Sequence, residues 1–399
     1  MKDRGKCLAV VSARRGFTAG AHDQERSLTS AMPTTATDPD PLAAEGLRDR
    51  VDAVLATFLA QQSEALTTVS PDCQELVESV VSLMRGGKRL RPAFCYWGWR
   101  GAGGEPSDQI VAAAASLELF QAAALIHDDL MDDSDLRRGM PAVHRRFAAL
   151  HAERGWQADG DRFGLAAALL AGDMCLVWTD ELFSGSGLSV EQLRGGREMF
   201  NRMRTELLGG QYLDVLTQAA PEPDPATAIT RARQVIRFKS AKYTIEHPLL
   251  IGAGLAGAAA PLRASYSAYG LALGEAFQLR DDVLGVFGDP RETGKPAGDD
   301  LREGKRTMLI ALALQRASPA QADLVRRLLG DPLLDAEGVA RLREMIIDTG
   351  AGAAVERLIS ELTDRAQAAL IGPDGDPVVN EPTHAVLSSL VVAATARAR

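Results

Sequence analysis

"VAAAASLELFQAAALIHDDLMDDSDLRRG", residues 111–139, joins a long apolar stretch to a sudden concentration of charge. The first half is rich in alanine and leucine and holds no glycine or proline, which predicts a helix over about 107–132. Five carboxylates follow within eight residues, and two arginines come next: Asp128, Asp129, Asp132, Asp133 and Asp135, then Arg137 and Arg138. Asp128 and Asp132 are one helical turn apart, so their like charges face the same way and repel. Most acidic runs are solvated helix ends, but this one directly follows an apolar segment.

Helical spacing of apolar residues continues through most of the chain from about Leu42. The further windows predicted as helices are 162–184, 189–217, 225–258, 262–287, 305–316, 319–330, 335–370 and 382–398. Convincing alternating strand patterns are missing, and the breaks between windows are short loops. We therefore predict a single all-α domain over 42–399. Residues 1–41 are polar and lack periodicity, which indicates a disordered N-terminal extension, and we expect translation to start at Met32.

Composition excludes several classes of protein. The 399 residues carry a net charge of −9, which argues against a protein that binds nucleic acid by neutralising phosphates. The four cysteines are widely scattered without metal-binding spacing, which favours a reduced, cytoplasmic protein. No window offers the roughly 18 uninterrupted apolar residues of a membrane span.

A second acidic pair occurs 153 residues after the first, in "FQLRDDVLGVFGD", where Asp281 and Asp282 again follow a helical apolar run. Two acidic helix ends can face each other across a cavity if divalent cations relieve the repulsion. Mg²⁺ suits such a site because it binds few carboxylates and leaves positions for substrate phosphates. A calcium-binding EF-hand loop counted from Asp133 fails, since its twelfth position is His144. The histidines lack zinc-ligand spacing, and His127 is more simply a structural residue.

Basic residues gather in separate turns that could bind anions. Arginine offers a bidentate fork to phosphate, and lysine offers a point charge. Besides Arg137 and Arg138, they are Lys88, Arg89 and Arg91 in "RGGKRLRP", Lys239 and Lys242 in "RFKSAKYT", and Lys295, Lys305 and Arg306 in "TGKPAGDDLREGKRT". Each turn alone is a weak signal. Together with the two acidic pairs, they indicate a site for a magnesium-bridged diphosphate with room for a second anion.

Five of these motifs occur in the order found in one known family. "GGKRLRP", "LIHDDLMDDSDLRRG", "FKSAKYT", "FQLRDDVLGVFGDP" and "GKPAGDDLREGKRT" together resemble the trans-isoprenyl diphosphate synthases of the polyprenyl synthetase family, over roughly residues 45–395. The resemblance implies an all-α isoprenoid-synthase bundle around a central substrate cavity, a homodimer, and three Mg²⁺ ions per active site. The substrates it implies are isopentenyl diphosphate and an allylic diphosphate.

The resemblance also implies roles for individual residues. The metal ligands would be Asp128, Asp132 and Asp281, with Asp129 and Asp282 as weaker candidates. The allylic diphosphate would be held by Arg137 and Lys239, with Lys295 and Lys305 as further candidates. Isopentenyl diphosphate would be bound by Lys88, Arg91, Arg138 and Gln121, the last of which stands where many relatives have histidine. Gln278 and the backbone around Lys239 and Ser240 would stabilise the allylic cation.

The chemistry implied is ionisation followed by carbon–carbon bond formation. Neutralised diphosphate departs, the double bond of isopentenyl diphosphate attacks the allylic cation, and a proton is lost, so no covalent nucleophile is needed. One departure from the family pattern stands out: the second motif ends in Gly285, where a third aspartate is expected. We expect activity to survive, with metal affinity in question.

Product length is predicted from the residues just before the first aspartates. In this family the product grows down a tunnel beneath them, and a bulky residue four or five positions upstream blocks it early. Ala123 and Ala124 leave the path open, and Phe120 could form a deeper floor, although alanine equally suits close helix packing. We expect a product of geranylgeranyl length (C20) or somewhat longer.

Two alternatives remain open from the sequence. A class I terpene cyclase also ionises allylic diphosphates with Mg²⁺, but it would leave "GGKRLRP" unexplained. A non-catalytic partner subunit of a prenyl diphosphate synthase is supported only by the missing third aspartate.

Overall fold

The computed structural model describes residues 44–221, 224–289, 298–331 and 333–395, and within them the fold is all-α, as predicted. The predictions on residues 1–41, on the start at Met32 and on Lys295 fall outside the described residues. The first half contains η1 (Ala44–Gly46), α1 (Leu47–Thr67), η2 (Pro71–Cys73), α2 (Gln74–Met84), α3 (Leu90–Gly101), α4 (Asp108–Met131), α5 (Val143–Glu153), α6 (Gly160–Ser184) and α7 (Val190–Ala219). The second half contains α8 (Pro225–Val235), η3 (Ile236–Glu246), α9 (His247–Leu255), α10 (Ala260–Phe287), α12 (Asp299–Arg302), α13 (Met308–Arg316), α14 (Pro319–Leu328), α15 (Ala336–Asp348), α16 (Ala351–Ala368) and α17 (Thr383–Thr395).

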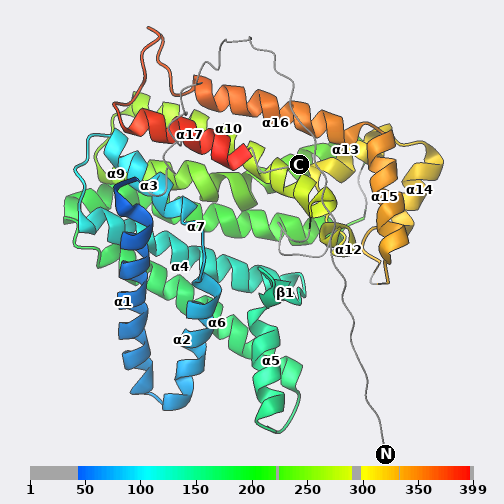
Figure 1. Cartoon of the computed structure of the whole chain (residues 1–399), viewed down its shortest axis with the longest axis horizontal. Helices are drawn as coiled ribbons and strands as arrows, with labels where there is room; N and C mark the ends of the chain where they lie inside the picture. The colour runs from blue at the N-terminus through cyan, green and yellow to red at the C-terminus, as the bar shows by residue number, and fades with distance from the viewer. Residues whose placement is uncertain (1–43, 222–223, 290–297, 332, 396–399) are drawn as a thin grey trace, which may run out of the picture. The chain divides into compact units, whose positions relative to one another are not determined.

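Helix α4 is the central element of the bundle (Figure 1). It begins at Ser107, whose side chain accepts a hydrogen bond from the Ile110 amide, as an N-cap should. Of its 24 residues, 14 are buried, because α1, α3 and α6 pack around it. A helix that is apolar on nearly all sides belongs in a core. Its acidic end is therefore delivered into the interior of the bundle, next to other helices.

The window 225–258 was predicted as one α-helix, and the structure modifies this. Residues 225–255 form one continuous helical run, but its middle part, η3, is a π-helix. This run packs along α7 and α10. π-Helical segments are rare and are found mostly at functional sites. The segment "RFKSAKYT", singled out for its lysines, lies within η3.

Two other predicted helices also differ from the structure. The window 335–370 contains α15 and α16, which separate at Gly350, where the backbone is left-handed (φ 69°). The window 305–316 begins late, because α13 starts only at Met308. The prediction that strands are missing overlooked one short hairpin: β1 (Leu136–Arg137) pairs antiparallel with β2 (Met140–Pro141). A strand of two residues is too short to show an alternating pattern.

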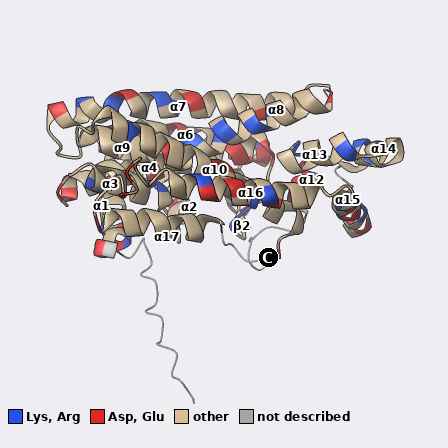
Figure 2. Ribbon diagram, turned by 90° about the horizontal axis from the view of Figure 1, so that it is seen from above, with Lys and Arg blue, Asp and Glu red and all other residues tan. Residues whose placement is uncertain are grey.

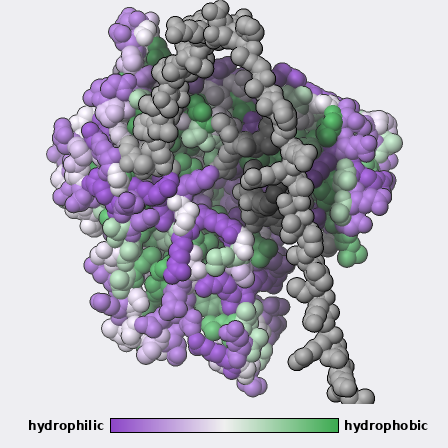
Figure 3. All heavy atoms as spheres, in the orientation of Figure 1, coloured by the Kyte–Doolittle hydropathy of each residue, from purple (hydrophilic) through white to green (hydrophobic). Residues whose placement is uncertain are grey.

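Two helices, α4 and α6, are long and apolar enough to cross a membrane by length and composition. The most apolar window of α4 is 72% buried inside the bundle, whereas that of α6 is 44% buried. Helix α4 is thus a core helix, while α6 presents apolar side chains at the surface. Hydrophilic side chains dominate the rim of the face in Figure 3, with apolar ones scattered among them.

Candidate active site

The first acidic cluster lies where α4 ends. Asp128 occupies the last turn of the helix and Asp132 is its C-cap, and the exposed fractions of these side chains are only 16% and 3%. A buried pair of like charges is stable only if cations or hydrogen-bond donors surround it. Both kinds of partner are present, and they come from α7, η3 and the segment after α12.

Lys239, from the π-helix, is the closest cation to Asp128. Its Nζ lies 2.9 Å from Asp128 Oδ1 and 2.5 Å from Asp214 on α7. Burial alone would raise the pKa of Asp128, but Lys239, Lys305 and Arg137 together hold it well below its usual range. The Asp128 carboxylate is therefore ionised and ready to bind a cation.

Lys305 pairs with Asp132 as Lys239 does with Asp128. Its Nζ lies 3.3 Å from Asp132 Oδ2, 2.5 Å from Glu303 and 3.8 Å from Asp300. Burial and the neighbouring Asp128 raise the pKa of Asp132, although Lys305 opposes this. Asp132 Oδ2 is buried and lacks a hydrogen-bond partner of good geometry. Such an oxygen indicates a position that a ligand completes.

The second acidic cluster lies on α10. Asp282 is buried and accepts a hydrogen bond of 2.8 Å from the Gln278 side chain. Burial raises the pKa of Asp282 to about 7, reinforced by Asp300 and Asp281. Asp281 itself is half-buried. The two aspartates thus differ in environment, and Asp281 is the more accessible candidate ligand.

Arg137 links the β1–β2 hairpin to the acidic end of α4. Its Nε lies 2.8 Å from Asp129 Oδ1, a second nitrogen also contacts Asp129, and that nitrogen lies 3.4 Å from Asp128. Asp129 is almost fully buried beneath this guanidinium. In this arrangement Asp129 orients Arg137, and Asp128 keeps its other oxygen for Lys239.

The residues predicted to bind isopentenyl diphosphate lie around the start of α3. Arg91 Nη2 donates to Thr244 Oγ1 at 2.7 Å, and its guanidinium stacks 4.1 Å above the Tyr243 ring. The Tyr243 hydroxyl donates a hydrogen bond to Gln121. Arg138 donates to the Leu83 carbonyl at 3.2 Å.

The electrostatics around Arg138 favour an anion. Burial lowers the pKa of Arg138, and Arg137, Arg89 and Arg91 lower it further. An arginine whose neighbours are arginines gains stability when an anion binds among them. Arg89 is the exception within its motif: it is buried and paired with Glu118 and Asp52, both at 2.7 Å. It anchors the turn that carries Lys88 and Arg91.

Several residues of the candidate site also have a strained, left-handed backbone conformation. Among the described residues, the non-glycine residues with positive φ include Arg89 (54°), Asp133 (50°) and Arg138 (54°), all within the motifs. Left-handed backbone is costly for such residues and tends to occur where function requires it.

Two site residues were not predicted. Gln211 on α7 donates to Asp128 at 2.8 Å, and Asp214, one turn further, binds Lys239. The only signal was the spacing of Gln211 and Asp214 in "GGQYLD", which on a helix resembles an ordinary solvated face.

Two other basic residues named from the sequence, Lys242 and Arg306, have partners other than the aspartates of the two acidic clusters. Lys242 pairs with Glu206 at 2.6 Å, and Arg306 donates to the Ala220 carbonyl at 2.8 Å.

The residues predicted to set product length lie within α4. Ala123 and Phe120 are buried and Ala124 is half-buried, and the Phe120 ring contacts the Tyr243 ring edge-on. That the product tunnel is open below Ala123 and Ala124 remains a prediction.

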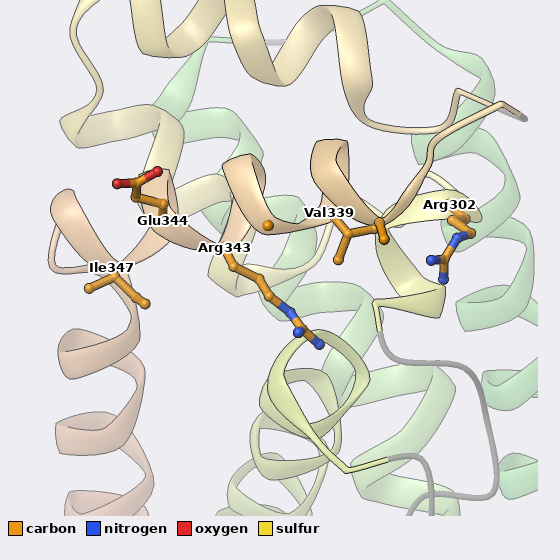
Figure 4. A pocket seen from close by; sticks show the side chains of 7 residues that line it. Arg302, Val339, Arg343, Glu344 and Ile347 are labelled. Atoms are coloured by element: carbon orange, nitrogen blue, oxygen red, sulfur yellow. The ribbon is translucent and has the colours of Figure 1, made fainter.

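A cavity of about 490 Å³ lies beside α15, lined by Arg302, Val339, Arg343, Glu344 and Ile347 (Figure 4). It contains none of the predicted site residues. A second cavity, of about 340 Å³, is lined by Glu303, Gly304 and Arg306 and so adjoins the Lys305 corner.

The carboxylates of the site suit Mg²⁺, whose coordination is completed by substrate phosphates and waters, better than they suit an ion held by protein side chains alone. Within the described part of the chain, no group of three or more His, Cys, Asp or Glu could by itself hold an ion. Magnesium is commonly bound by one or two carboxylates plus substrate phosphates and waters. Asp128 and Asp132 at one helix end, with Asp281 on α10, match that requirement.

Comparison with known proteins agrees with this site. Residues 73–346 match the model of the polyprenyl synthetase family, so the chain belongs to this family and is a prenyltransferase. It is 33% identical over 271 residues to a geranylfarnesyl diphosphate synthase of Aeropyrum pernix, covering 67% of this chain and 77% of that one. It is 30% identical over 305 residues to a geranylgeranyl diphosphate synthase of Mycobacterium tuberculosis, covering 76% and 79%.

A solved structure is also similar. The geranylgeranyl pyrophosphate synthase of Corynebacterium glutamicum, complexed with isoprenyl diphosphate and magnesium, is 42% identical with a TM-score of 0.82, covering 90% of this chain and 99% of that one. The family resemblance, the fold and the enzyme class predicted from the motifs are therefore confirmed. Elongation of prenyl chains is the activity of this family, and the cyclase alternative finds no support among these relatives.

Proposed function

We propose that this prenyltransferase condenses isopentenyl diphosphate with an allylic diphosphate, with Mg²⁺ as cofactor, to give an all-trans product of C20 or somewhat longer. The observation that carries the proposal is the convergence of acid and base at the end of α4. Asp128 and Asp132 are each matched by a lysine from a different segment, Lys239 and Lys305. Such a cluster can exchange its internal ion pairs for a metal-bound diphosphate without leaving any buried charge unpaired.

In this proposal each residue either helps to neutralise a negatively charged diphosphate or stabilises the positively charged allylic intermediate. Mg²⁺ held by Asp128, Asp132 and Asp281 would neutralise the allylic diphosphate. Lys239, released from Asp128, and Arg137 bind the leaving oxygens and stabilise the charge that develops as the carbon–oxygen bond breaks. Lys88, Arg91 and Arg138 hold the second diphosphate near Gln121. The Gln278 side chain and the peptide of Lys239 provide dipoles beside the allylic cation.

The test is a product assay with the purified protein, Mg²⁺ and labelled isopentenyl diphosphate. Dimethylallyl, geranyl and farnesyl diphosphates are supplied separately, and products are identified by mass. We expect a prenyl diphosphate of C20 or longer, lost in Asp128→Ala and kept in Asp135→Ala. Asp135 is a suitable control because its exposed side chain pairs with Arg145 on the surface. No consumption of isopentenyl diphosphate with any primer would refute the proposal and favour the partner-subunit alternative.

We further propose that the enzyme is a cytoplasmic homodimer that uses α6 and α7 as its interface. Large apolar side chains are exposed on both helices: Leu165, Leu169, Leu170 and Val177 on α6, and Leu208, Tyr212, Val215 and Leu216 on α7. Figure 2 shows α7 along the edge of the bundle opposite α17. Exposed apolar surface of this extent is typical of an interface, and a second copy is the partner that the family resemblance implies.

The oligomeric state can be tested by light scattering. We expect the wild type to have the mass of a dimer and Leu208→Asp/Tyr212→Asp to shift toward the monomer. Ile347→Asp, at an exposed apolar position on α15, is the matched control. A wild-type monomer, or a double variant that stays dimeric, would refute this interface.

A further inference from the structure

The missing third aspartate of the second acidic cluster has a counterpart elsewhere in the chain. Gly285 stands one helical turn after Asp281 on α10, where an aspartate side chain would share the same helix face. A Cβ placed on Gly285 would lie 1.9 Å from Asp300 Oδ2 and 2.5 Å from Asp300 Cγ. The carboxylate of Asp300 therefore already occupies the space that an aspartate at 285 would need.

Asp300 also faces the site rather than solvent. Its side chain is only 15% exposed, and Lys305 Nζ lies 3.8 Å from its Oδ1. The same Nζ lies 3.3 Å from Asp132 Oδ2. One ammonium group thus contacts a carboxylate of the first acidic cluster and the carboxylate beside Gly285. Asp300 consequently borders the space between the two clusters.

The local backbone fixes this position. Asp300 lies in α12, and the Lys305 amide donates to the Asp300 carbonyl at 3.0 Å, which closes the turn between the two residues. Leu301, between them, is buried and anchors the turn in the core. A short, anchored turn holds a side chain as firmly as a helix does, so the carboxylate need not come from α10 itself.

We propose that Asp300 supplies the carboxylate that α10 lacks at position 285 and, with Asp281, holds Mg²⁺ at the second acidic cluster. The inference rests on the proposed function, because it concerns the same metal-bound diphosphate. It explains why glycine stands at 285: any side chain there would displace Asp300.

The first experiment measures Mg²⁺ binding by calorimetry, in the presence of a non-cleavable allylic thiodiphosphate. We expect Asp300→Asn to weaken Mg²⁺ binding roughly tenfold to a hundredfold, the range for groups that support metal sites. Asp299→Asn, the same charge change one residue away, is the matched control and should bind nearly as the wild type does. Equal binding by Asp300→Asn and the wild type would overturn the inference.

A reciprocal exchange tests whether the carboxylate can move between the two positions. Asp300→Gly and Gly285→Asp should each bind Mg²⁺ more weakly, the latter because its new side chain collides with Asp300. The double variant Gly285→Asp/Asp300→Gly should recover binding to within a few-fold of the wild type. A double variant that melts like the wild type but binds no better than either single variant would contradict the exchange. If the wild type itself binds neither Mg²⁺ nor the thiodiphosphate, the proposed function fails, and this inference fails with it.

Discussion

At the scale of single residues, two lysines, Lys239 and Lys305, pair with the buried carboxylates at the end of α4. Lys239 and Lys305 were predicted from the sequence, because basic residues in short motifs are conspicuous. Gln211 and Asp214 were not, because a polar residue on a helix looks the same whether it faces solvent or an active site. Only the packing of α7 against η3 distinguishes the two. The partners of a charged motif are thus harder to find in one sequence than the motif itself.

Replacing Lys239 tests the allylic diphosphate site. In Lys239→Met the buried Asp128 and Asp214 lose their shared cation, and the leaving group loses a donor. We expect kcat/KM for the allylic substrate to fall at least about a hundredfold, as for the loss of one donor to developing charge. Lys242→Met is the control, since Lys242 pairs with Glu206. Equal losses in the two variants, measured by steady-state kinetics, would contradict this role.

Tyr243 tests the second diphosphate site. Its hydroxyl holds Gln121 and its ring supports Arg91, so it couples two predicted ligands of isopentenyl diphosphate. Tyr243→Phe keeps the ring and removes one hydrogen bond of about 1 kcal/mol. We expect KM for isopentenyl diphosphate to rise about fivefold while KM for the allylic substrate is unchanged. A parallel rise in both constants would indicate a general structural defect instead.

At the scale of elements, periodicity predicted most helices, and its failures have local causes. The window 225–258 read as one α-helix because π and α turns share similar apolar spacing over a few residues. The π-helical part nonetheless matters, since it carries Lys239 and Tyr243. The hairpin at Leu136–Pro141 was overlooked, although its turn carries Arg138. The errors therefore fall where the backbone departs from regular geometry and carries residues of the candidate site.

Helix α4 is also the element that should set product length. Ala124 lies one turn before Asp128, and a phenylalanine there would project below the diphosphate site. We expect Ala124→Phe to shorten the main product by at least one C5 unit. Ala112→Phe, a similarly half-buried alanine three turns earlier, should leave the product length unchanged. An unchanged product with Ala124→Phe, determined by mass spectrometry of a folded variant, would place the end of the tunnel elsewhere.

At the scale of the whole molecule, buried polar groups make stability depend on pH. His247 is buried at the start of α9, 3.4 Å from Glu206. Burial, together with Lys242 and Arg202, lowers the pKa of His247 to about 3. Its ordinary value is about 6.5, so between these values the unfolded chain binds a proton that the folded chain does not. The free energy of unfolding therefore falls as pH decreases through this window.

Between pH 7.5 and 5.5 we expect His247 to account for a loss of about 1 kcal/mol. In His247→Gln this contribution disappears, so the decrease in Tm between the two pH values should be smaller than in the wild type. Calorimetric melts of both proteins at both pH values provide the comparison. An identical decrease in the two proteins would mean that His247 is protonated as easily when folded as when unfolded.

The proposed site also requires two acidic clusters that lie 153 residues apart in the sequence to share one metal-bound diphosphate, and this can be observed directly. The measurement is anomalous diffraction from Mn²⁺ in crystals of the protein with an allylic thiodiphosphate. We predict manganese on Asp128 and Asp132 and a further manganese on Asp281 and Asp300, with the diphosphate between them. Manganese confined to other sites, or a diphosphate held without any contact to α10, would contradict a shared site.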